Sequence, residues 1–109
     1  MVTCIKSFGF KHGVPPCHDF ILDVRELPNP YSDPKLRSFR GDHQKVISFF
    51  ERHHSKVSRL YSEWLELVKA QNGTILVGCT GGMHRSVYIA NRLAKDLNIP
   101  VEHLNYHDK

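Results

Sequence analysis

Nine residues, GCTGGMHRS (78–86), bring together residue types that can attack or bind a phosphate group. Five residues separate Cys79 from Arg85, and Ser86 follows directly. The two adjacent glycines let the backbone turn sharply and approach a ligand closely. Arg85 offers a planar fork of donors that matches phosphate oxygens. The stretch is therefore a cradle for a nucleophile, a phosphate-binding loop, or only a tight turn.

The spacing Cys-x5-Arg-Ser also occurs in cysteine-based phosphatases, in which a thiolate attacks phosphorus while the arginine holds the equatorial oxygens. Amide groups at a helix N-terminus would favour the thiolate form of Cys79. Asp42 or Asp33 would then protonate the leaving group. Against this hypothesis, Gly78 stands where that superfamily has a histidine, and the pattern arises often by chance. Catalysis by Cys79 with Arg85 and Asp42 is therefore kept as the alternative to a binding site.

The neighbouring sequence predicts the elements that position this loop. An apolar strand, TILVG (74–78), leads into it, and RSVYIANRLAKDL (85–97) has the periodicity of a helix. Asn98 and Pro100 end that helix, and a last strand follows at 101–106. Strand, loop, helix and strand at this spacing form a βαβ unit with parallel strands and a right-handed crossover.

The amino-terminal part adds two further strands and a long helical segment. Residues 2–10 and 19–24 have the composition of strands, whereas three prolines make 25–42 a long structured loop. From 43 to 72, apolar residues recur every three or four positions, which predicts one helix, or two with a bend near the HHSK motif. We expect a single α/β domain over 1–109, with a small, mostly parallel sheet, helices packed on it, and ligand loops at the strands' carboxyl ends.

Composition limits the class of protein. The chain has 109 residues, 40% of them hydrophobic, which suits one globular domain with a core. Its formal net charge of +4 favours anionic partners such as phosphate or nucleic acid. Neither the three cysteines nor the eight histidines have the spacing of a disulfide framework or a metal site, so we expect no cofactor and no metal. Without a signal peptide or an apolar run of about 20 residues, we expect a soluble, cytoplasmic domain with no membrane partner.

The 78–86 loop would bind a phosphate whether or not Cys79 reacts. Its amides lie at the mouth of the predicted helix, where unpaired N–H groups and the helix dipole favour an anion. His84 adds a charge-assisted contact when protonated, and we expect Arg85 to face the ligand and not the core. A Walker motif is absent, so ATP hydrolysis is not implied. The expected ligand-binding residues of this loop are Cys79, Thr80, Gly81, Gly82, Met83, His84, Arg85 and Ser86.

Four stretches of the chain resemble the C-terminal domain of the RapZ family of bacterial RNase adaptors. They are SFGFKHGVP (7–15), FILDVRELPNPYSDPKLR (20–37), GD (41–42) before the helical segment, and GCTGGMHRSVYIANRLA (78–94). The resemblance covers nearly the whole chain in order, and both long motifs are specific. Members normally carry an N-terminal P-loop kinase-like domain, so the sequence resembles a stand-alone version of the C-terminal one.

The resemblance implies a non-catalytic sensor of glucosamine-6-phosphate. It further implies a domain that binds a small regulatory RNA, presents it to an endoribonuclease and assembles as a homo-oligomer. By matched position, the phosphosugar site would use Asp23 and Arg25 together with the 79–85 loop, with the Asp23 carboxylate accepting from sugar hydroxyls. Tyr31 stands where the family has a histidine, so that sugar contact is altered.

The resemblance predicts RNA binding less completely than sugar binding, because some basic residues of the family are absent from this sequence. The basic residues expected to contact RNA phosphates are Lys11, His12, Arg37 and Arg40. Met83 replaces a lysine of the family, the motif NYHD replaces HRT or HRD, and the basic tail is missing after YHDK. These differences predict weaker contact with an RNA backbone. Two alternatives stay open: an RNA-binding module without a metabolite, and a solvated basic face without RNA.

Overall fold

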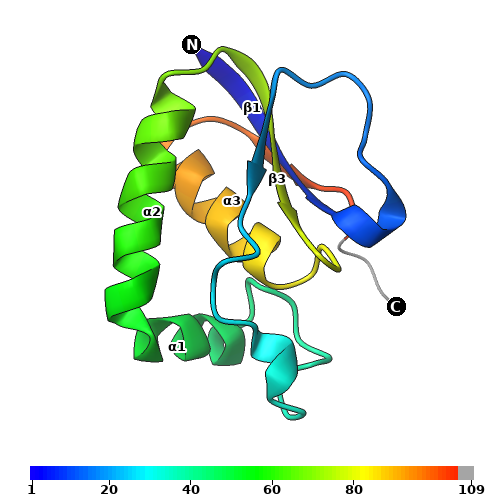
Figure 1. Cartoon of the computed structure of the whole chain (residues 1–109), viewed down its shortest axis with the longest axis vertical. Coiled ribbons are helices and arrows are strands. Elements are labelled where there is room, and N and C mark those ends of the chain that lie inside the picture. Colours follow the sequence, from blue (N-terminus) through cyan, green and yellow to red (C-terminus); the bar gives the residue numbers. More distant parts are fainter. Residues whose placement is uncertain (106–109) are drawn as a thin grey trace.

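The computed structural model describes residues 1–105 and has an all-parallel four-stranded sheet with helices packed against it (Figure 1). Its main elements, in chain order, are β1 (Val2–Gly9), β2 (Phe20–Asp23), α1 (Gln44–Arg52), α2 (His54–Lys69), β3 (Gly73–Cys79), α3 (Arg85–Leu97) and β4 (Val101–His103). Single 3-10 turns occur at Phe10–His12 and Pro30–Ser32. The strand order is β2-β3-β1-β4, and each neighbouring pair is parallel. The prediction of an α/β fold with a small parallel sheet is confirmed.

The direction of each connection decides which face of the sheet it covers. The steps from β2 to β3 and from β3 to β4 run the same way across the sheet, whereas the step from β1 to β2 runs back. Because crossovers between parallel strands are right-handed, the helices that connect β2 to β3 and β3 to β4 share one face of the sheet. The connection from β1 to β2 has no α-helix and passes over the opposite face (Figure 1). All four carboxyl ends then meet at one edge, where ligands of such sheets gather.

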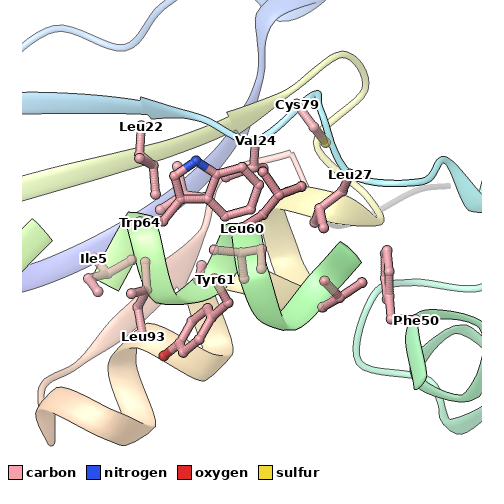
Figure 2. Close-up of a cluster of buried hydrophobic side chains, with 14 of the residues drawn as sticks. Ile5, Leu22, Val24, Leu27, Phe50, Leu60, Tyr61, Trp64, Cys79 and Leu93 are labelled. Carbon is pink, nitrogen blue, oxygen red and sulfur yellow. The ribbon is translucent and has the colours of Figure 1, made fainter. Parts of the chain in front are cut away.

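The core fills the space between the helices and the sheet. From the sheet side it takes Ile5, Leu22, Val24, Ile75 and Val77, and from the helices Phe50, Leu60, Trp64, Ile89 and Leu93. Figure 2 shows Trp64 and Leu60 of α2 against Leu22 and Val24. Burying each such side chain contributes about 1.5–3 kcal/mol, which is what holds α2 and α3 in place behind the ligand edge.

The helical segment predicted from 43 to 72 forms two helices, and the bend near HHSK is confirmed. His53 ends α1 and begins α2 with φ −105° and ψ 33°, outside the helical region. It is exposed, although the apolar periodicity placed it in the buried stripe, because the change of helix direction turns it away from the core. The His43 side chain accepts a hydrogen bond from the Lys45 amide and caps α1.

The last strand is shorter than the predicted 101–106. The β4 strand ends at His103, and Leu104 donates its amide to the Ser7 carbonyl at 2.9 Å before the chain turns. Asn105 then leaves the sheet to accept from the Gly9 amide at 2.7 Å. This side-chain contact competes with further strand pairing; residue 106 lies outside the described part of the chain. No helix within 1–105 is long and apolar enough to cross a bilayer.

Candidate functional site

A cavity of about 1100 Å³ opens at the edge where the strands end. Each of the four strands contributes the segment that follows it. The main polar and aromatic residues of the lining are Lys11 and His12 after β1; Asn29, Tyr31, Arg37, Phe39, Arg40, Asp42 and His43 after β2; Cys79, Thr80, Met83, His84 and Arg85 around the loop after β3; and Asn105 after β4. Chain segments far apart in the sequence therefore form one site, as the parallel topology requires.

Backbone contacts without intervening side chains bring these segments together. The Gly41 amide donates to the Met83 carbonyl at 2.7 Å, and the Lys11 amide donates to the Thr80 carbonyl at 3.1 Å. A Cβ at Gly41 would lie 2.3 Å from the His84 carbonyl oxygen, and one at Gly9 would lie 2.4 Å from the Gly81 carbonyl carbon. Only glycine fits at either position, so both neighbours of the 79–84 loop are held against it directly.

Cys79 contributes to the cavity lining, but its sulfur is hydrogen-bonded within the loop. Its thiol donates to the Ser86 hydroxyl at 3.2 Å, and the Gly82 amide donates to its sulfur at 3.3 Å. The residue is 2% exposed and lies at the margin of the core (Figure 2). The sulfur therefore ties the start of the loop to the first turn of α3, and Gly82 and Ser86 lie outside the cavity lining.

Arg85 differs from the expectation that it faces only the ligand. The residue is buried, and its Nη1 donates to the Arg25 carbonyl at 2.8 Å, although it also contributes to the cavity wall. A buried guanidinium keeps its charge, so its remaining donors strengthen any anion held at the start of α3. The hydrogen bond to Arg25 also fixes the beginning of the long loop after β2.

His84 supplies a buried polar atom that lacks a partner. The residue is 7% exposed and lines the cavity. Its Nε2 has no hydrogen-bond partner within the part of the chain that the structure describes. Burial lowers the pKa of His84, and the backbone groups of Phe39 and Leu36 oppose the shift. Buried polar atoms are almost always paired, so this nitrogen is an exception that needs an explanation.

Asp23 and Arg25 are not part of the cavity lining. They pair with each other: the Arg25 Nη2 lies 2.8 Å from Asp23 Oδ2, and its guanidinium sits 4.2 Å from the centre of the Phe10 ring. The Arg25 amide also donates to the Asp23 carboxylate, and the hydrogen bonds from Arg25 hold the pKa of that carboxyl below its ordinary value. The charge of Arg85 lowers the pKa of the Asp23 carboxyl further, so the pair lies close to the start of α3, and its expected contact with a sugar stays a prediction.

The four basic residues expected to contact RNA all lie in the lining of the same cavity. Arg37 is held in place, since its Nε donates to the Tyr31 carbonyl at 2.7 Å and its guanidinium lies 4.5 Å from the centre of that ring. Asp42 lines the cavity and Asp33 does not. The residues expected to bind an anion and those expected to contact RNA therefore line one cavity.

Sequence reasoning missed several lining residues, Asn105 and Phe39 among them. Asn105 accepts from the Gly9 amide through its Oδ1, which leaves its amide nitrogen for other contacts. The signal that could have found it is positional, because it follows β4 at the edge where the other three loops already converge. Phe39 stacks on His43 with their ring centres 4.2 Å apart, a pair that no local pattern indicated.

Comparison with known proteins shows which family the chain belongs to. The family model described as the RapZ C-terminal domain matches residues 1–108. The chain belongs to the RapZ C-terminal domain family. Proteins named RNase adapter protein RapZ from Yersinia enterocolitica and Yersinia pseudotuberculosis are 50% and 47% identical to it over 103 residues. The match covers 86% of this chain and 36% of each relative, so the chain spans about a third of their length. The resemblance to the RapZ family is thereby confirmed.

A methyl group at Gly41 should separate the two loops that meet there. We expect Gly41→Ala to lower the free energy of unfolding by about 1–3 kcal/mol, because the added Cβ overlaps the His84 carbonyl. Gly81→Ala is the matched control, since a Cβ there meets nothing within 4 Å. Urea unfolding measures both. Equal stability of the two variants would show that the loops are not in backbone contact.

Proposed function

We propose that this domain is a non-catalytic sensor that binds a phosphorylated sugar such as glucosamine-6-phosphate in the cavity. The observation that carries the proposal is the buried, unpartnered Nε2 of His84 in the cavity wall. It lies at the N-terminus of α3, where the first amides of a 13-residue helix favour an anion. The unpaired His84 nitrogen and the N-terminus of α3 are independent features, and both favour an anionic ligand group at this place.

The charges around the cavity suit a phosphate. Within the described residues, its lining contains the cations Lys11, Arg37, Arg40 and Arg85 against the single carboxylate of Asp42. Thr80 and Gly81 line the cavity next to the start of α3, with backbone that can approach the phosphate. A phosphomonoester carries close to two negative charges at pH 7, which this excess of cations offsets.

The sugar portion would meet the remaining polar residues. Asn29 and Asn105 provide amide groups that both donate to and accept from hydroxyls. The Asp42 carboxylate supplies the negative charge that a protonated amino group requires.

The phosphatase alternative receives less support from the same loop. A nucleophilic thiolate has to reach the phosphorus atom, whereas Cys79 is 2% exposed and its thiol donates to Ser86. The Arg85 guanidinium is turned partly toward the Arg25 carbonyl. Both contacts serve the shape of the loop, so the geometry supports holding a phosphate better than transferring it.

RNA binding and adaptor activity complete the proposal. The named relatives are RNase adapter proteins, and the basic lining of the cavity would contact RNA phosphates in this domain. A ribonuclease partner, assembly as a homo-oligomer and a cytoplasmic location belong to the same proposal. Because Lys11, His12, Arg37 and Arg40 border the sugar site, RNA and metabolite would approach the same edge of the sheet.

Calorimetry tests the sugar-phosphate site. Glucosamine-6-phosphate should bind, inorganic phosphate should bind more weakly, and glucosamine without a phosphate should give no heat. Thr80→Val removes one hydroxyl from the lining and should weaken binding about two- to tenfold. Thr3→Val changes an exposed threonine outside the cavity lining and should bind as the unchanged protein does. No heat from either phosphate compound with folded protein would overturn the proposal.

The protonation of His84 predicts how affinity depends on pH. Burial keeps its pKa below the usual value of about 6.5, so the imidazole is neutral at pH 7, and a bound dianion favours the charged form. Binding then takes up a proton, and affinity should rise as the pH is lowered from 7. Sulfate is the probe, because its own charge is constant over this range.

The contribution of His84 can be separated from that of the other imidazoles in the lining. His84→Gln should remove the rise in sulfate affinity at low pH, whereas His12→Gln, also in the lining, should retain it. Isothermal titration at several pH values measures both profiles. A His84→Gln profile that matches the unchanged protein would exclude this nitrogen from the anion site.

Salt dependence tests the contact with RNA. For a short single-stranded RNA, the logarithm of the binding constant should fall linearly with the logarithm of salt concentration. Lys11→Ala should make that slope shallower by about 0.7. Lys56→Ala removes an exposed lysine of α2, outside the cavity lining, and should leave the slope unchanged. Equal slopes for the two variants would place the RNA elsewhere on the domain.

A further inference from the structure

The cavity is larger than a sugar phosphate requires. Its volume of about 1100 Å³ slightly exceeds the roughly 300–1,000 Å³ found for sites that hold drug-sized ligands. The phosphate site proposed above uses only the part of the cavity that the 79–85 loop forms. The segment after β2 lines most of the rest, so the chemistry of residues 29–43 largely decides what that space can hold.

That segment presents aromatic rings paired with cations. Tyr31 is 56% exposed, and the Arg37 guanidinium lies 4.5 Å from the centre of its ring. Phe39 stacks on His43, and the Lys45 ammonium lies 5.1 Å from the centre of the Phe39 ring. An exposed aromatic ring in a cavity wall offers a flat apolar face to a ligand. A nucleobase stacks its own π-face on such a ring, whereas a sugar presents only C–H groups to it.

Tyr31 is also held in position before any ligand arrives. The Asn29 side chain accepts from the Tyr31 amide at 3.1 Å, and the Arg37 Nε donates to the Tyr31 carbonyl at 2.7 Å. Both contacts use the backbone of Tyr31 and leave its ring as the exposed part. A platform fixed in this way binds a flat group at a lower entropic cost than a mobile side chain would.

From these observations we infer that the cavity also takes a nucleotide, with its terminal phosphate on the 79–85 loop and its base stacked on Tyr31. The ribose then occupies the space proposed for the sugar, between Asn29 and Asn105. The inference rests on the proposed phosphate site and extends its ligand class from sugar phosphates to nucleotides. The nucleotide comes either from solution or from the phosphorylated end of an RNA strand.

Comparing adenosine 5′-monophosphate with ribose 5-phosphate isolates the contribution of the base. By calorimetry the nucleotide should bind about tenfold or more tightly than the sugar phosphate, as a stacked base provides. Tyr31→Ala should abolish that difference, so that the two compounds bind with similar affinity. Tyr31→Phe keeps the ring and should retain the difference, which distinguishes stacking from a contact of the hydroxyl group.

Each outcome separates this inference from the proposed function. Binding of glucosamine-6-phosphate and ribose 5-phosphate without a gain from the base would overturn the inference and leave the sugar-phosphate site standing. A gain from the base that persists in Tyr31→Ala would also overturn it. Failure of every phosphate compound to bind would overturn both.

A last comparison decides the source of the nucleotide. A four-nucleotide RNA with a 5′-phosphate should bind more tightly than the same RNA with a 5′-hydroxyl if the cavity takes a strand end. If its occupant is a free nucleotide, the phosphorylated RNA should bind no better than adenosine 5′-monophosphate. Either result supports a nucleotide site, provided that Tyr31→Ala weakens binding.

Discussion

The absence of a Cβ atom at Gly9 and Gly41 is the constraint on which the rest of the site depends. At both positions a methyl group would overlap the backbone of the 79–84 loop. Because it is missing, the segments after β1 and β2 touch that loop directly, and main-chain hydrogen bonds from Lys11 and Gly41 close both contacts. Side chains between these segments would push them apart and spread the cations of the cavity over a wider surface.

This construction is accompanied by groups that a structure selected only for stability would avoid. His84 and Arg85 are buried at the start of α3, one with an unpartnered nitrogen and the other carrying a full charge. Desolvating such groups is unfavourable unless something compensates for it. For Arg85, the Arg25 carbonyl offsets part of that cost. The unpartnered His84 nitrogen has no such compensation within the described residues, which is why a ligand is the natural explanation for it.

The fold could be predicted further than the site, and for physical reasons. Apolar periodicity reports which face of an element is buried, so the strand, helix and strand after residue 73 were accessible from the sequence. The periodicity ran through His53 and left one helix or two open, and it gave no sign that β1 lies between β3 and β4. Contacts between distant loops carry no periodic signal. That is why Asn105 and Phe39 were missed, and why Cys79, a candidate nucleophile by spacing, proved to be hydrogen-bonded within its own loop.

Asp23 and Arg25 form a short-range ion pair at the end of β2. The Asp23 carboxylate is two residues from Arg25, and the guanidinium binds it while stacking on Phe10. The backbone of Arg25 has a different role, since its carbonyl accepts from Arg85. Arg25 therefore binds a carboxylate through its side chain and fixes the Arg85 guanidinium through its backbone. A guanidinium fixed in advance loses less conformational entropy when an anion binds, which is how preorganisation raises affinity.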